Sequence, residues 1–178
     1  MDALVSAPHR LEKLFLAGKL GKLPHWFNSL HSLTYLSLHW SRLRDDFLPH
    51  IQALPNLGEI SLLNAYEGER LYFLEGFQKL KILTIRKCPR LKEIVMNKGV
   101  MPGLEQLHIT ECQELIRLPH GWETLPDLKE VYLRNVSGGM IEKIYGSENM
   151  DQPPIRTIRL RRDEDGEAVF KCVGKGYY

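Results

Sequence analysis

Three cysteines and seven histidines are the residues of this chain best suited to bind a metal or act as a nucleophile. Cys88 and Cys112 lie at the same place in two similar stretches of sequence, so we expect their thiols to be neighbours. A metal pair or a disulfide is conceivable, but two small buried side chains with weak S–H donors are the plainer interpretation. Cys172 has no evident partner. Three cysteines form no paired framework, which is typical of a reducing compartment.

The histidines show no spacing typical of a metal site or a catalytic site. His25, His50 and His120 each follow a proline in a recurring segment, which indicates a structural repeat rather than a ligand cluster, and we expect them to lie in a line. The chain contains no Gly-x-Ser-x-Gly elbow and no phosphate-binding Gly-x-x-x-x-Gly-Lys-Ser/Thr loop. We therefore expect no enzymatic activity, no metal, no cofactor and no nucleotide binding by this chain.

The elements that position these residues are indicated by a phrase of aliphatic residues, Leu-x-x-Leu-x-Leu, or a close variant. It returns at intervals of 22, 24, 23, 24, 24 and 27 residues, with first positions at Leu11, Leu33, Leu57, Leu80, Leu104, Leu128 and Ile155. Such a period is typical of a leucine-rich repeat solenoid. The predicted fold is thus α/β: seven short strands form a concave parallel sheet, and short helical or 3₁₀ segments return the chain.

The returning segments carry a second pattern, Leu-Pro-His followed by apolar residues. It occurs at residues 23–30, 48–54 and 118–125, where proline ends the extended stretch and starts a helical turn. We expect residues 73–80 to do the same without proline. The apolar residues of these segments are predicted to pack in or near the core, namely Trp26, Phe27, Ile51, Phe77 and Trp122.

The repeats define one domain, at residues 1–160, followed by a charged C-terminal tail or loose cap at 161–178. A helical turn is expected at residues 140–145, and a polar loop at 147–154. The formal charge is only +2, which gives no reason to expect nucleic acid as a partner. No apolar run is long enough to span a membrane, and none resembles a signal peptide, so we expect a cytoplasmic protein. The sequon at Asn135 is therefore expected to be unused.

Function is expected on the strand positions that alternate with the core leucines and point to the other face. Tyrosine and arginine often dominate interface energies. The candidate protein-binding residues are Tyr35, His39, Arg86, His108, Tyr132, Arg134, Arg159 and Arg161. Only Glu59 and Glu130 oppose the arginines on this face, so the later rows are predicted to be positive. An ordinary solvated sheet face is the alternative, and the loops around Trp40 and Tyr66 are the alternative recognition surface.

Two copies of the repeat extend the phrase to Leu80-x-x-Leu83-x-Ile85-x-x-Cys88-x-x-Leu91 and Leu104-x-x-Leu107-x-Ile109-x-x-Cys112-x-x-Leu115, the second leading into Leu118-Pro119. This form resembles the C-terminal repeats of plant intracellular nucleotide-binding leucine-rich repeat disease-resistance proteins of the coiled-coil class. The resemblance covers residues 8–160. It implies a repeat region that senses pathogen effectors and restrains a nucleotide-binding switch.

The partner implied by this resemblance is a protein, either a pathogen effector or an intramolecular nucleotide-binding module. The nucleotide-binding loop of that family is absent from this sequence, so the switch cannot be assigned to these residues. The alternative is a free-standing cytosolic repeat protein that acts as an adaptor or scaffold without an immune role. The oligomeric state cannot be read from the sequence.

Overall fold

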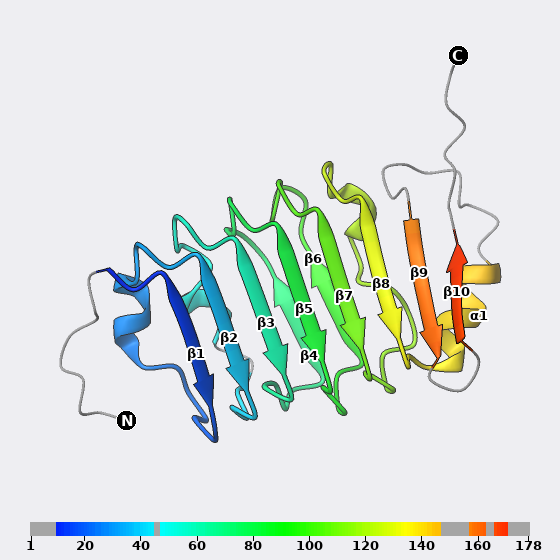
Figure 1. Ribbon diagram of the computed structural model, residues 1–178, viewed down its shortest axis with the longest axis horizontal. Helices are drawn as coiled ribbons and strands as arrows, with labels where there is room; N and C mark the ends of the chain where they lie inside the picture. Colours follow the sequence, from blue (N-terminus) through cyan, green and yellow to red (C-terminus); the bar gives the residue numbers. More distant parts are fainter. Residues whose placement is uncertain (1–9, 45–46, 147–156, 163–165, 171–178) are drawn as a thin grey trace, which may run out of the picture.

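The computed structural model describes residues 10–44, 47–146, 157–162 and 166–170, which form a stack of repeats (Figure 1). The larger sheet contains the strands β1 (Lys13–Ala17), β2 (Tyr35–His39), β3 (Glu59–Leu63), β5 (Ile82–Arg86), β7 (Gln106–Thr110), β8 (Glu130–Arg134), β9 (Thr157–Arg162) and β10 (Gly166–Phe170). The first seven run parallel in this order, and β10 pairs antiparallel with β9. The predicted seven-strand solenoid is confirmed.

Consecutive parallel strands pair without any shift between their leucine phrases. Leu14 pairs with Leu36, and Leu36 pairs with Ile60, so equivalent residues of successive repeats form rows across the sheet. The leucines of the inner strands are almost fully buried. Burial of one such side chain contributes roughly 1.5–3 kcal/mol. Leu14 and Leu16 of β1 are only partly buried, because no described strand lies on the outer side of β1.

The residue after each of the strands β1, β2, β3, β5, β7 and β8 adopts a left-handed backbone. We call these the exit residues: Gly18, Trp40, Asn64, Lys87, Glu111 and Asn135. The N–H of each donates to the carbonyl oxygen of the next strand's last paired residue, with N···O distances of 2.7–3.0 Å. A left-handed backbone costs a residue other than glycine roughly 1–2 kcal/mol. The backbone hydrogen bonds between repeats offset this cost and continue the strand pairing past the end of each strand.

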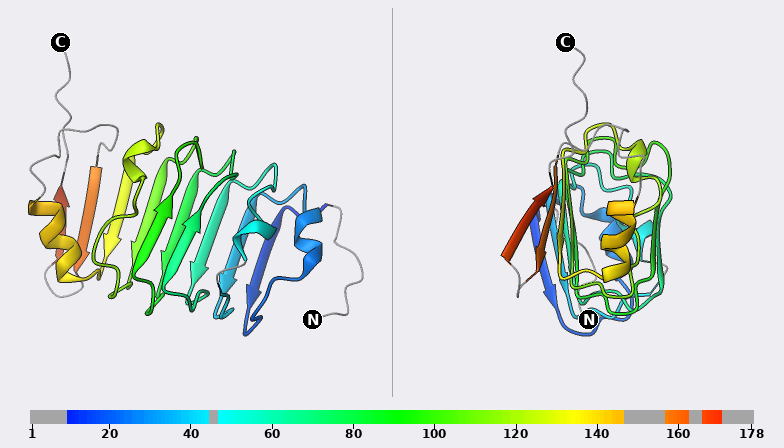
Figure 2. Two further views of the ribbon diagram at one scale, coloured as in Figure 1. Left: turned by 180° about the vertical axis from the view of Figure 1, so that it is seen from behind. Right: turned by 90° about the vertical axis from the view of Figure 1, so that its right-hand side faces the viewer.

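The returning segments form the layer opposite the larger sheet, as the end-on view in Figure 2 shows. As predicted, three of them contain 3₁₀ turns, η1 (His25–Ser29), η2 (Leu48–His50) and η3 (Trp122–Thr124). Trp26, Phe27, Ile51 and Phe77 are buried, and Trp122 packs against the core, which confirms their predicted role.

The prediction of a helical turn near Phe73 was wrong. Phe73 ends strand β4 (Arg70–Phe73), which pairs parallel with β6 (Glu93–Met96) in a second, two-stranded sheet. Two successive repeats here return in extended form, so their backbones can pair with each other. His120 continues this pairing by a bridge to Val95, whereas His25 begins η1 and His50 ends η2. The three histidines therefore occupy different local structures.

A nine-residue helix, α1 (Gly138–Gly146), follows β8 and includes the predicted turn. Ser137 caps it, because the Ser137 Oγ accepts a hydrogen bond from the Met140 N–H at 3.1 Å and donates one to the Leu115 carbonyl at 2.9 Å. The serine of the possible glycosylation sequon thus has a structural role. The loop expected at 147–154 lies outside the described residues. Strand β10 belongs to the stretch expected to form a tail or cap.

The thiols of Cys88 and Cys112 are buried and free. Each can donate to a backbone carbonyl, with Sγ···O distances of 3.7 Å from Cys88 to Arg86 and 3.5 Å from Cys112 to Thr110. The contact with Cys112 and burial raise the pKa of the Cys88 thiol well above its ordinary value. The buried-thiol interpretation is confirmed. Cys172 lies outside the described residues.

Charged residues at the entrance of the strands also connect repeats. The Glu105 carboxylate lies between the ammonium groups of Lys81, at 2.9 Å, and Lys129, at 2.7 Å. Hydrogen bonds to Lys129 and Lys81 lower the pKa of Glu105 from 4.5 to about 2. The ionised carboxylate therefore stabilises the stack at neutral pH.

We expect Glu105→Gln to reduce the acid sensitivity of the fold. Because the pKa is lower in the folded state, the contribution of Glu105 is complete above about pH 4.5 and is lost as the pH falls toward 2. Melting temperatures measured by circular dichroism between pH 6 and pH 2 should therefore fall less for the variant than for the wild type. Glu114→Gln, at an exposed position, is the control. Parallel curves for Glu105→Gln and the wild type would contradict this expectation.

Gly121 lies where a returning segment passes close to its neighbour. Its φ is +84°, and a Cβ there would lie 1.9 Å from the Met96 carbonyl oxygen. Gly99 has a similar φ of +87°, but a Cβ there would meet no atom within 4 Å. The two glycines thus separate the cost of the backbone conformation from the cost of close approach.

We expect Gly99→Ala to lower the free energy of unfolding by about 1–2 kcal/mol, which is the cost of the left-handed conformation. Gly121→Ala should cost about 1–3 kcal/mol more, because the backbone must move to relieve the overlap. Urea unfolding followed by circular dichroism measures both. Equal losses of unfolding free energy in the two variants would contradict this expectation, because they would show that neighbouring returning segments can move apart at no energetic cost.

Candidate protein-recognition surface

The face of the larger sheet that points away from the returning segments presents three rows of side chains. The middle row illustrates the register: Phe15, Ser37, Ser61, Thr84, His108, Tyr132 and Arg159 follow one another across the seven parallel strands. We call the three rows together the exposed face. The sequence predicted these outward positions, and the strand pairing places all eight candidate residues on this face.

One half of the exposed face, over β5, β7, β8 and β9, carries the later candidates and is called the basic end. Here Arg134 pairs in register with Arg161, and Tyr132 pairs with Arg159. The His108 and Tyr132 rings meet edge to face, with centroids 5.6 Å apart. Two aromatic rings thus lie among several arginine side chains. Tyrosine and arginine are both enriched at the centres of protein interfaces.

The basic end is less positive than the sequence suggested. Arg159 Nε lies 2.8 Å from the Glu130 carboxylate, so the two charges form an ion pair across adjacent strands. Arg86 Nε lies 3.4 Å from Glu111, whose carboxylate also contacts Lys87 at 3.5 Å. Glu111 was missed because it is an exit residue and belongs to none of the three strand rows. Extending each row by one residue would have found it.

Among the described outward and exit positions of the basic end, five residues are basic and two are acidic. These are Arg86, Lys87, Arg134, Arg159 and Arg161 against Glu111 and Glu130, with Glu59 on the neighbouring strand β3. The net charge remains positive, but the ion pairs place negative carboxylates between the positive side chains. A partner must therefore match individual charges, rather than simply carry a large negative charge.

The other half of the exposed face, over β1 and β2, is called the aromatic end. Phe15 is 65% exposed, and its ring lies 4.9 Å, between centroids, from that of Tyr35. Trp40 is 52% exposed and meets the His39 ring edge to face at 5.6 Å. The His39 Nε2 lies 2.9 Å from the Ser37 Oγ, which holds the imidazole beside the sheet.

The two residues of the alternative surface, Trp40 and Tyr66, differ in exposure. Tyr66 is buried, with 1% of its surface exposed, and its hydroxyl donates a hydrogen bond to the Arg70 carbonyl. It therefore belongs to the core, whereas Trp40 extends the aromatic end. Large exposed aromatic side chains can bury much surface against a partner at a small entropic cost.

The exposed face offers recognition chemistry through rings, guanidinium groups and carboxylates. Within the described part of the chain, no group of three or more histidine, cysteine, aspartate or glutamate residues is arranged to hold a metal ion. In the same residues, no helix has the length and apolar character needed to cross a bilayer.

The His108 imidazole is the titratable group at the centre of the basic end. Burial lowers its pKa below 6.5, while the nearby carboxylates of Glu130 and Glu59 act in the opposite direction. The ring is therefore predominantly neutral at pH 7, which lets it pack against Tyr132 without a charge. A His108 whose pKa is depressed on folding favours the native state more as the pH rises toward 6.5.

We expect the pKa of His108, followed by NMR of its ring protons, to lie below 6.5. Glu130→Gln should lower it further, because the change removes a carboxylate that favours the imidazolium and releases the cation of Arg159. Glu114→Gln, which lies away from the strands, should leave the titration unchanged. A pKa above 6.5 in the wild type would show that the carboxylates outweigh burial.

Comparison with known proteins follows the repeat pattern. The family described as "Leucine-rich repeat region" matches residues 1–147. The chain is 44% identical over 158 residues to disease resistance protein RPM1 of Arabidopsis thaliana, covering 89% of this chain and 17% of the relative. Disease resistance RPP8-like protein 3 of Arabidopsis thaliana is 29% identical, covering 78% of this chain and 16% of that protein. Disease resistance protein Pik-2 of Oryza sativa subsp. japonica is 30% identical, with 74% and 15% covered. The chain thus spans about a sixth of the length of these relatives.

Proposed function

We propose that this chain, which belongs to the leucine-rich repeat region family and is similar to plant disease resistance proteins, is the recognition and regulatory repeat region of a plant immune receptor. In this role it binds protein partners, senses pathogen effectors and restrains a nucleotide-binding switch in the cytoplasm. The observation that carries the proposal is the 44% identity to a disease resistance protein over 89% of the chain. The proposed function is protein recognition rather than catalysis.

The exposed face supports this proposal physically. Seven parallel strands hold its side chains on a rigid backbone, so little conformational freedom is lost when a protein docks. The aromatic end supplies apolar area, and the basic end supplies guanidinium groups that can bind carboxylates through two parallel hydrogen bonds. The two ends together suit a partner with an apolar patch beside separated acidic side chains.

The content of the reading frame that carries these residues provides the first test. A nucleotide-binding module encoded upstream in the same frame would support the receptor proposal. A reading frame that encodes repeats alone would favour the cytosolic adaptor or scaffold instead. Sequencing of full-length transcripts makes this distinction without any assumption about the partner.

We expect Arg134→Glu combined with Arg161→Glu to weaken binding to such a module, supplied as a separate polypeptide. The loss should be several kcal/mol if the guanidinium groups are desolvated by the partner, and under about 1 kcal/mol if they lie at the rim. Calorimetric titration gives the dissociation constants. Arg159 is left unchanged, because a glutamate there would meet the Glu130 carboxylate and could disturb the sheet.

Lys79→Glu combined with Lys98→Glu is the matched control, since it makes the same charge change at exposed positions outside the strands of the exposed face. Both double variants should retain the circular dichroism spectrum and melting temperature of the wild type. Equal binding by both variants would move the recognition surface away from the basic end.

A further inference from the structure

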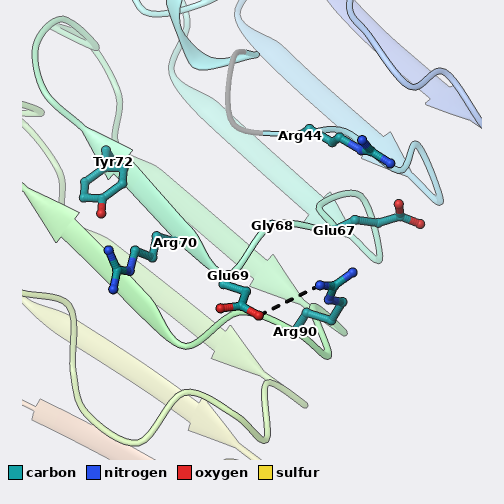
Figure 3. Close-up of a pocket in the computed structure, with 7 residues that line it drawn as sticks. All are labelled: Arg44, Glu67, Gly68, Glu69, Arg70, Tyr72 and Arg90. Atoms are coloured by element: carbon teal, nitrogen blue, oxygen red, sulfur yellow. Dashed lines mark ion pairs between the residues drawn. The ribbon is translucent and has the colours of Figure 1, made fainter.

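A polar groove of about 660 Å³ lies on the returning side of the repeats, away from the exposed face. It is lined by Arg44, Glu67, Gly68, Glu69, Arg70, Tyr72 and Arg90, and Figure 3 shows these residues in an arc. Arg44 and Glu67 lie at one end of the arc, Tyr72 lies at the other, and the Glu69–Arg90 ion pair lies between them. No role described above uses this groove.

The three arginines of the groove come from three successive repeats. Arg44 follows β2, Arg70 begins β4, and Arg90 follows β5. The spacing between repeats therefore separates their guanidinium groups along the stack, as the rows on the exposed face are separated. A ligand that contacts all three must be extended rather than compact.

The existing ion pairs leave much of the donor capacity of these arginines unused. Arg90 lies 3.9 Å from the Glu69 carboxylate, and Arg70 lies 3.4 Å from Glu93, distances too long for a short charge-assisted hydrogen bond. The side chains of Arg70 and Arg90 are 65% and 67% exposed. Each guanidinium has five N–H donors in a planar fork.

Tyr72 adds a ring and a hydroxyl at one end of the groove. Its side chain interacts with Arg70, and this interaction raises the pKa of the guanidinium above its ordinary value. Tyr72 is 41% exposed, so a partner can also pack against its ring. Gly68 exposes backbone between the charged residues without a side chain of its own.

We propose that this groove binds an extended acidic polypeptide segment, whose carboxylates pair with Arg44, Arg70 and Arg90 in turn. Glu67 and Glu69 line the same groove and repel a compact, highly charged anion, but a peptide can place its carboxylates between them. The surface is distinct from the exposed face, so it provides a second docking site whatever partner binds there.

The test uses a short fluorescein-labelled peptide that alternates glutamate with alanine, with fluorescence anisotropy as the readout. Saturable binding is expected for this peptide, and none for a peptide with glutamine in place of glutamate. The combination Arg44→Gln, Arg70→Gln and Arg90→Gln should weaken binding at least about tenfold, since each lost pair removes a charge-assisted contact. The combination Lys79→Gln and Lys98→Gln, at exposed positions outside both the groove and the exposed face, should leave it unchanged.

A variant expected to strengthen peptide binding distinguishes loss of the binding site from loss of the fold. Glu69→Gln removes the carboxylate shared by Arg90 and by Lys92, at 3.1 Å, and should tighten binding severalfold. Weaker binding by Glu69→Gln, unchanged binding by the triple variant, or no saturable binding to the wild type would overturn the proposal. Displacement of the peptide by an equal concentration of inorganic phosphate would also overturn it, because the groove would then prefer compact anions.

Discussion

A single repeat of this protein cannot bury its own leucines, and this constraint governs the structure. Leu36 and Leu38 are fully buried because strands lie on both sides of β2, whereas Leu14 and Leu16 at the first strand are only partly covered. Each repeat therefore depends on its neighbours for burial as well as for hydrogen bonds. The same register that buries the leucines also arranges the outward side chains in rows, so stability and recognition rest on one alignment.

That alignment could be predicted from the sequence because a spacing of two residues leaves little choice of face. The positions of Tyr35, Arg86 and Tyr132 followed directly from their places between core leucines. Strands β4 and β6 could not be predicted in this way, because each has only four residues and forms by pairing with the other. Phe73 therefore suggested a helical turn, although its backbone is extended.

The ion pairs of the candidate surface could not be predicted from the alternating sequence pattern. Arg159 and Glu130 are 29 positions apart in the chain, and their ion pair depends on side chains of adjacent strands meeting in space. Glu111 reaches Arg86 from an exit residue, outside the alternating pattern. The sequence could identify which residues face outward, but the partial neutralisation of the arginines required the arrangement of neighbouring repeats.

The exit residues have a consequence for how such a surface can change over evolutionary time. Glycine, tryptophan, asparagine, lysine, glutamate and asparagine occupy equivalent places after successive strands, and all serve the same backbone hydrogen bond. The bond uses only main-chain atoms, so the identity of the side chain is largely separated from the integrity of the stack. Substitutions at these corners can thus alter the chemistry presented to a partner while the architecture is inherited intact. In this protein the six corners therefore combine one shared backbone arrangement with five different side-chain types.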